Sequence, residues 1–437
     1  MKPRTIVRIL QDRYLATGLR ENYWNTRHLA AELAGLFRSE NAAFRRHALR
    51  DQVQYLLDTV QPVAGETSAR ARAAVDWLLR AQGASGNAGV SLGYFPCSED
   101  GSAWRPSYPE TTGYIITSLL SFAERFGDDA VRSAALDMAH WEVEIQMDSG
   151  AVQGGPLCAP ELRKPAAFNT GMVLDGWCSA YAAAKDATLL AAARRAADFL
   201  VDDLDANGYF RTNGPFVSSG EIKTYTCLCA WAMYRLGEIT GEARYAQAAL
   251  RSIDAALRQQ QPNGWFAHNC LARSDAPLTH TIGYTLQGIL EVGIASGRQD
   301  LVAAVRRSVD ALIPRITGRG YLWGMFYADW EPAGLSSCLT GSAQVSVVCY
   351  RLYEHSGAQP YFDAAERLLN YLKALQAMTS SYPAVDGALA GSFPLFGEYM
   401  RAGYPNWATK YLLDALMLQE RLGERRATID CNSGVCL

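Results

Sequence analysis

The chain has 437 residues, of which 49% are hydrophobic and 19% are charged, and its formal net charge is -3. This composition is ample for a large core, and the near balance of 41 basic and 44 acidic residues gives no indication of a nucleic-acid or anionic-membrane partner. No stretch of the sequence reaches the length of a membrane span, so we expect a cytoplasmic protein.

The first part of the chain has apolar residues at helix-compatible spacings, for example Leu29, Leu33 and Leu36. The helical pattern ends at residues 61–65, which include a proline and a glycine. We therefore expect an N-terminal helical extension over residues 1–62.

From about Thr67 one pattern repeats six times. Each unit has an amphipathic helix, a loop with a glycine followed by an aromatic residue, and a helix rich in small residues. In residues 243–258, Tyr245 and Ile253 belong to the apolar stripe and Arg251 to the opposite face. Comparable helices are centred on Trp77, Trp141, Phe199, Val309 and Leu369. These patterns predict outer helices with one side in solvent.

The small-residue helices follow at nearly constant intervals. They align on Gly113, Gly171, Cys227, Gly283, Gly341 and Ala408. Small side chains allow helices to crowd together, and the lack of a charged face predicts burial on nearly all sides. Six outer and six inner helices predict a double ring.

Four motifs mark the starts of inner helices. They are Tyr108-Pro109-Glu110-Thr111-Thr112-Gly113-Tyr114, Leu278-Thr279-His280-Thr281, Cys338-Leu339-Thr340-Gly341 and Tyr404-Pro405-Asn406-Trp407-Ala408-Thr409-Lys410. With this repeat count, residues 67 to 424 resemble the six-hairpin (α/α)6 toroid superfamily of glycosidases, polysaccharide lyases and sugar epimerases. The chain also looks like toroid proteins encoded among bacterial polysaccharide-biosynthesis functions. The resemblance implies an all-α (α/α)6 toroid over residues 63–424, a tail over 425–437, and an oligosaccharide or polysaccharide substrate.

Glu110 is the candidate acid for hydrolysis of a glycosidic bond. It lies at an inner-helix start between Tyr108 and Tyr114, where desolvation would raise its pKa, although the helix dipole favours the anion. A glycosidase needs a second carboxylate to activate water or act as nucleophile, and Asp275 is our candidate. A first-turn acid that merely stabilises its helix is the structural alternative for Glu110.

A second chemistry is proton abstraction beside a uronate carboxylate, by a lyase or a C5-epimerase. His280 and Tyr284 are one helical turn apart after Thr279, the expected N-cap, and supply a base and an acid. Lys410 or Arg105 could neutralise the carboxylate. The structural alternative for His280 is a hydrogen-bonded core histidine.

The loops that enter the inner helices are expected to form a polar, aromatic-rich cup at one end of the ring. Sugars stack on aromatic faces and bind fixed hydrogen-bonding groups. The predicted substrate-binding residues are Arg105, Tyr108, Asn169, Lys223, Tyr225, Trp265, Gln344, Asn406 and Lys410. The alternative for any single aromatic residue is packing between hairpins.

No cofactor or metal is predicted, because Cys227 and Cys229 point apart on one helix and no other Cys/His grouping has suitable spacing. The Cys431/Cys436 tail could be disordered, closed by a disulfide or metal-binding. Two further functions stay open: a non-catalytic glycan-binding protein and a class II terpene cyclase-like toroid. We favour hydrolysis over uronate elimination or epimerisation.

Overall fold

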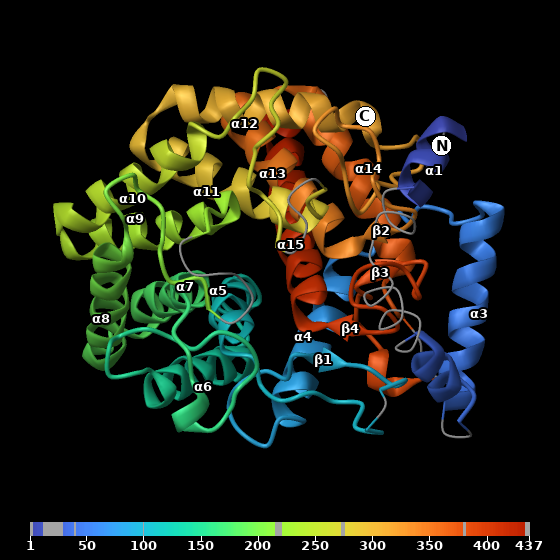
Figure 1. The fold of residues 1–437 in the computed structure, drawn as a ribbon, viewed down its shortest axis with the longest axis horizontal. Coiled ribbons are helices and arrows are strands. Elements are labelled where there is room, and N and C mark those ends of the chain that lie inside the picture. Colours follow the sequence, from blue (N-terminus) through green and yellow to red (C-terminus); the bar gives the residue numbers. More distant parts are fainter. Residues whose placement is uncertain are drawn as a thin grey trace.

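The computed structural model describes residues 3–11, 29–38, 41–98, 100–214, 221–271, 276–378 and 382–432, with side chains to residue 425 in the last range. Helices α1 (Pro3–Leu10) and α3 (Ala42–Leu57) precede the ring and lie at one side of it (Figure 1). Residues 29–36 are also helical.

The described part of the chain forms a double ring of helices that confirms the predicted all-α (α/α)6 toroid. The outer helices are α4 (Thr67–Gly83), α6 (Asp129–Ile145), α8 (Ala187–Asp203), α10 (Ala243–Leu257), α12 (Gln299–Leu312) and α14 (Gln359–Leu375). The inner helices are α5 (Pro109–Phe126), α7 (Ala167–Ala184), α9 (Leu228–Thr240), α11 (Thr279–Ser296), α13 (Leu339–Ser356) and α15 (Asn406–Asn432). Short 3-10 helices span Pro160–Leu162, Thr224–Cys227, Ile313–Arg315 and Pro383–Val385.

Each inner helix packs on the next, and α15 packs on α5, which closes the inner ring. Two short antiparallel pairs add to this closure. Strand β1 (Gly93–Tyr94) pairs with β4 (Tyr404–Pro405), which ties the first hairpin to the last, and β2 (Ser337–Cys338) pairs with β3 (Ser392–Phe393).

Each of the first five inner helices passes to the next outer helix through a tight turn at the same end of the ring. Gly127, Gly241, Gly297 and Gly357 end four of them in the left-handed conformation, which glycine adopts without steric cost. The long loops therefore gather at the opposite end, where the inner helices begin. We call these the loop end and the turn end of the ring.

Close packing explains the small residues of the inner helices. A Cβ atom on Gly113 would lie 2.5 Å from Val173 Cα, and one on Gly341 would lie 2.6 Å from the backbone nitrogen of His280. One alignment point differs from expectation, since Cys227 ends a 3-10 turn and α9 begins one residue later. Thr279 is also the first residue of α11 and not its N-cap, and its hydroxyl donates to the Trp323 carbonyl at 2.7 Å.

Large aromatic residues fill the space between the two rings. Trp77 of α4 and Trp177 of α7 are fully buried, and the Trp177 indole donates to the Ala139 carbonyl at 3.0 Å. Among the described residues, no helix combines the length and the apolar character that crossing a membrane requires.

Candidate active site

Glu110 lies in the first turn of α5, at the loop end of the ring, with only 9% of its surface exposed. The Tyr108 hydroxyl donates a hydrogen bond of 3.0 Å to its Oε2 atom. Burial raises the pKa of Glu110 to about 7, and the Tyr108 hydrogen bond partly opposes this shift. The carboxyl group can therefore hold a proton near neutral pH, which a general acid requires.

Four tyrosines from different parts of the ring lie within electrostatic reach of Glu110. Burial raises the pKa of each phenol, and the negative charge of Glu110 raises it further; the residues are Tyr114, Tyr225, Tyr284 and Tyr399. Tyr284 packs on Phe168, and Phe168 packs on Tyr225, with ring centroids 4.9 and 5.3 Å apart. The carboxyl group is thus surrounded by phenol side chains.

His280 is buried in the first turn of α11 and stacks on Tyr284, with ring centroids 4.3 Å apart. Its Nδ1 atom lies 3.0 Å from the Gln344 side-chain oxygen. Because that oxygen accepts, Nδ1 carries the proton and Nε2 keeps the lone pair. Burial lowers the pKa of His280 to about 4, so the imidazole is neutral at pH 7.

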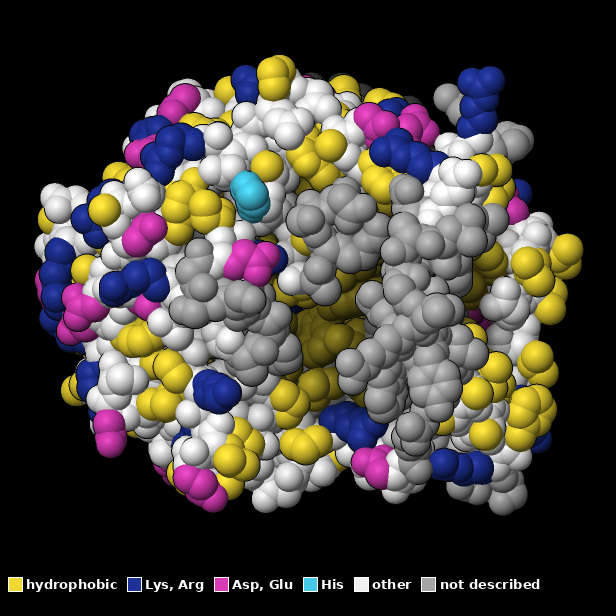
Figure 2. All heavy atoms as spheres, in the orientation of Figure 1, with side chains coloured by type: hydrophobic (Ala, Val, Ile, Leu, Met, Phe, Trp, Pro, Cys, Tyr) yellow, Lys and Arg dark blue, Asp and Glu magenta, His cyan; other side chains and the backbone are white. Residues whose placement is uncertain are grey.

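Seven predicted site residues therefore gather around the ring axis at the loop end. Asn169 belongs to them because a hydrogen bond from its side chain lowers the pKa of Tyr108. We call these seven residues, together with Tyr114 and Tyr399, the central cluster; its nine members are Tyr108, Glu110, Tyr114, Asn169, Tyr225, His280, Tyr284, Gln344 and Tyr399. Figure 2 shows that the loop end is hollowed at its centre, with hydrophobic side chains on the visible floor.

Two predicted residues, Asn406 and Trp265, make contacts that point to structural roles. The Asn406 amide nitrogen donates to the Ser91 carbonyl and the Thr111 hydroxyl, both at 2.8 Å, and so joins α15 to α5. Trp265 is 5% exposed and packs edge-on against Trp330, with centroids 5.1 Å apart. These contacts fit a role of Trp265 in packing between hairpins better than a role in stacking against a sugar ring.

The predicted cations are already paired. Arg105 forms an ion pair of 2.9 Å with Asp100 in the loop before α5. Lys223 lies 2.8 Å from Glu221, and Lys410 lies 2.7 Å from Asp414. Asp275, the predicted second carboxylate, lies outside the described residues. So does Cys436 of the tail.

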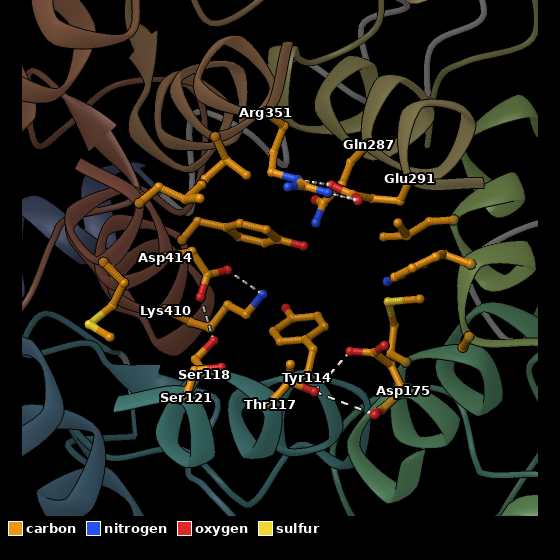
Figure 3. A pocket seen from close by; sticks show the side chains of 18 of the residues that line it. Tyr114, Thr117, Ser118, Ser121, Asp175, Gln287, Glu291, Arg351, Lys410 and Asp414 are labelled. Carbon is orange, nitrogen blue, oxygen red and sulfur yellow. Dashed lines mark hydrogen bonds and ion pairs between the residues drawn. The ribbon is translucent and has the colours of Figure 1, made fainter. Parts of the chain in front are cut away.

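A second cavity occupies the ring axis beyond the central cluster, toward the turn end (Figure 3). Its volume is about 640 Å³, and residues from all six inner helices line it. We call it the turn-side cavity. Its polar lining includes Thr117, Ser118, Asp175, Arg235, Gln287, Glu291, Arg351, Lys410 and Asp414.

The expectation that the inner helices lack a charged face is wrong. Ion pairs between neighbouring inner helices in the wall of the turn-side cavity join Asp175 to Arg235 at 2.5 Å and Glu291 to Arg351 at 2.7 Å. The signal in the sequence is an isolated charge one or two turns after an aligned small residue, such as Asp175 after Gly171. The small residues of these helices predict close helix packing, and the predicted site residues do not include these ion pairs.

The described residues contain no group of three or more His, Cys, Asp or Glu side chains arranged to hold a metal ion. Cys178, Cys227, Cys229 and Cys349 are buried thiols, and burial raises the pKa of each. The cysteines on the inner helices thus serve as small hydrophobic side chains.

The chain is similar in fold to carbohydrate-degrading enzymes of known structure. The unsaturated glucuronyl hydrolase of Bacillus sp. GL1 superposes with a TM-score of 0.64 at 17% identity, covering 81% of this chain and 97% of that one. A heparin-specific unsaturated glucuronyl hydrolase gives 0.62 at 14% identity, covering 82% and 98%. The GH76 α-mannanase of Bacteroides thetaiotaomicron gives 0.62 at 12% identity, with the same coverage.

No protein-family model matches the chain, and no curated protein sequence matches it. At these identities the similarity shows the fold alone. It confirms the predicted (α/α)6 toroid, and it identifies no residue that acts on a substrate.

Proposed function

We propose that this protein is a carbohydrate-active enzyme that hydrolyses a glycosidic bond, with Glu110 as the general acid. The observation that carries the proposal is the buried Glu110 carboxyl group, whose pKa is about 7 and whose Oε2 atom accepts from Tyr108 at 3.0 Å. A carboxyl group that is protonated near neutral pH can donate to the oxygen of a leaving sugar. The hydrolase names of the structural neighbours agree with this reaction class.

The reaction balances with water as the second substrate. Glu110 gives its proton to the glycosidic oxygen as the bond to the anomeric carbon breaks, and a water oxygen bonds to that carbon. The proton that the water loses passes to a base, for which we keep Asp275 as the candidate. The products are a free alcohol and a sugar with a new reducing end.

The phenol rings of the central cluster support a sugar as the substrate. Tyr225 and Tyr284 come from separate hairpins and bring aromatic rings within electrostatic reach of the Glu110 carboxyl group. Sugar rings pack on such faces, while the amide groups of Asn169 and Gln344 offer donors and acceptors to hydroxyl groups. The Nε2 of Gln344 is buried and has no partner among the described residues, so it is available to a ligand in the cluster.

Proton abstraction by His280 and Tyr284 is the second candidate function. The neutral imidazole with its lone pair on Nε2, stacked 4.3 Å from the Tyr284 ring, favours it. A uronate lyase or C5-epimerase also needs a group that neutralises the substrate carboxylate. Lys410 and Arg105, the cations predicted for that role, are each paired with a protein carboxylate, which favours hydrolysis.

One experiment separates these functions. The protein is incubated with neutral and uronate oligosaccharides in deuterated water and followed by mass spectrometry and ultraviolet absorbance. New reducing ends without a new absorbance support hydrolysis. An unsaturated chromophore, or deuterium gained without cleavage, moves the assignment to His280 and Tyr284. Binding without any conversion across the panel contradicts both and favours a glycan-binding protein.

We also propose that the protein is located in the cytoplasm. The sequence expectation is the cytoplasm, where buried thiols such as Cys178 stay reduced. Cell fractionation with an antibody against the protein tests it, and recovery outside the cytoplasmic fraction contradicts it.

A further inference from the structure

The turn-side cavity is closed at its inner end and reaches solvent at the turn end. Tyr114, Lys410 and Tyr411 line it and are 3%, 5% and 1% exposed. Ser121 and Glu124, about two and three turns after Tyr114 along α5, also line it and are exposed. Glu110 is not among its lining residues. Its volume of about 640 Å³ is within the range of small-molecule sites.

Each basic side chain that lines this cavity is paired with a carboxylate, although the partners of Arg125 and Arg421 lie outside the lining. The Lys410 ammonium lies 2.7 Å from Asp414, and the Arg351 guanidinium makes two hydrogen bonds of 2.7 Å to Glu291 (Figure 3). Arg235 is paired with Asp175 in the same way. A charged ligand would have to compete with these built-in partners, so the lining selects against a net charge on the ligand.

The same ion-paired side chains can still form hydrogen bonds with the hydroxyl groups of a ligand. A paired guanidinium keeps N–H donors that its carboxylate does not use, and a paired carboxylate keeps lone pairs. Asp414 also accepts from Ser118 at 2.6 Å, and Asp175 accepts from Thr117 at 2.9 Å, which fixes the carboxylates in place. The lining therefore alternates fixed donors and acceptors around the ring axis.

Four buried polar atoms of lining residues have no hydrogen-bond partner among the described residues: Tyr114 Oη, Gln287 Oε1 and the Nε atoms of Arg125 and Arg421. Buried polar groups are nearly always satisfied by protein, water or a ligand. Trp231 of α9 adds a partly exposed indole to the lining. An aromatic face beside fixed, uncharged or charge-paired polar groups is the arrangement that recognises a sugar ring.

We infer that the turn-side cavity is a binding site for a neutral, polyhydroxylated ligand of mono- or disaccharide size. It lies on the turn side of the central cluster and shares only Tyr114 with it, so it is a second ligand site. The inference does not depend on the hydrolytic role of Glu110.

The test is isothermal titration calorimetry with methyl α-D-glucopyranoside, methyl α-D-mannopyranoside, maltose and cellobiose. Glucuronate and glucosamine serve as charged counterparts of similar size. Ser121→Trp places a large side chain in the cavity from an exposed helix position, and Ser121→Ala is the matched control at the same residue. Circular dichroism verifies that each variant is folded.

We expect at least one neutral probe to bind with millimolar or better affinity, and at least tenfold more tightly than its charged counterparts. Ser121→Trp should weaken this binding at least tenfold, and Ser121→Ala should leave it within twofold. Trp231→Leu, which removes the aromatic face, should also weaken it. Binding that neither Ser121→Trp nor Trp231→Leu changes would place the sugar elsewhere, and tighter binding of the charged probes would overturn the neutral class. No binding of any probe also overturns the inference.

The outcome is distinguishable from a failure of the proposed function. Where both sites bind a probe, Ser121→Trp lowers the stoichiometry from two to one and leaves turnover unchanged. Where the central cluster binds none, the same variant abolishes binding altogether.

Discussion

Tyr108 and Glu110 are two residues apart in the sequence, and the Tyr108 hydroxyl donates to the Glu110 carboxyl group across 3.0 Å in the centre of the helical ring. Burial favours the protonated acid, whereas this hydrogen bond favours the anion. Their balance gives a pKa of about 7 and leaves both protonation states accessible near neutral pH. A group that gives up a proton and regains it in each turnover needs this property.

Removal of the Tyr108 hydroxyl should shift the pH dependence of catalysis. A general acid acts in its protonated form, so activity should fall as pH rises through the pKa of Glu110, near 7. Tyr108→Phe deletes the donor that stabilises the anion and should move this alkaline limb upward by about one pH unit, the equivalent of a charge-assisted hydrogen bond of about 1.5 kcal/mol. The measurement is the pH profile of kcat/KM, and a limb that stays in place or moves downward contradicts the assignment.

Glu110 should also make the stability of the protein depend on pH. Its folded pKa of about 7 is above the ordinary value of 4.5, so the folded chain holds a proton that the unfolded chain releases between those values. This contribution is fully present below pH 4.5 and declines as pH rises toward 7. A glutamine side chain cannot ionise, so the Glu110→Gln variant does not lose this stability as pH rises. Between pH 4.5 and 7 its free energy of unfolding should therefore increase by up to roughly 3 kcal/mol relative to that of wild type.

Urea unfolding at several pH values measures this effect. Asp137→Asn, at an exposed position of α6, is a control that should leave the pH dependence of the wild type unchanged. Parallel stability curves for wild type and Glu110→Gln would mean that the folded-state pKa of Glu110 is not raised.

His280 should be neutral, with its proton on Nδ1. Burial lowers its pKa to about 4, and the Gln344 hydrogen bond partly opposes this shift. Nitrogen-15 NMR of the imidazole should therefore show the Nδ1–H tautomer from pH 8 down to about pH 5. Gln344→Leu should lower the pKa further and mix the two tautomers. An imidazolium signal at pH 6 in the wild-type protein is incompatible with this environment.

The inner ring should tolerate no added methyl group at Gly113. A Cβ atom there would lie 2.5 Å from Val173 Cα, in the contact between α5 and α7. Gly113→Ala should destabilise the protein by about 1 to 3 kcal/mol through overpacking. Gly423 of α15 has open space around its Cβ position, so Gly423→Ala should instead stabilise by up to about 1 kcal/mol. Thermal unfolding of both variants measures these effects, and equal shifts of the melting temperature would contradict close helix packing at Gly113.

The sequence predicts the fold well because its repeat combines two independent signals. Glycines such as Gly113 and Gly341 mark helices that must approach closely, and the amphipathic stripe around Tyr245 marks helices with a solvent side. Helix periodicity is a local property of the sequence, so each hairpin can be predicted from its own residues alone. The repeat count then implies closure into a ring.

The candidate site is predictable in part. Glu110 and His280 are found because helix starts at the loop end can be located from the sequence, and they do gather with Tyr284. Tyr399 is missed because it lies in the long loop before α15, where no periodicity fixes its position. The ion pairs of the turn-side cavity are missed because partners such as Glu291 and Arg351 are on neighbouring helices of different hairpins, and pairing between hairpins leaves no local pattern.

The substitution Glu110→Gln tests the central claim most directly, because it removes the transferable proton and keeps the size and the neutrality of the buried side chain. Turnover of the oligosaccharide that the wild-type protein cleaves should fall by about 10² to 10⁴-fold, while the circular dichroism spectrum stays unchanged. The matched substitution Asp137→Asn should keep wild-type turnover. Cleavage by Glu110→Gln at the wild-type rate would contradict the account and remove Glu110 from the reaction.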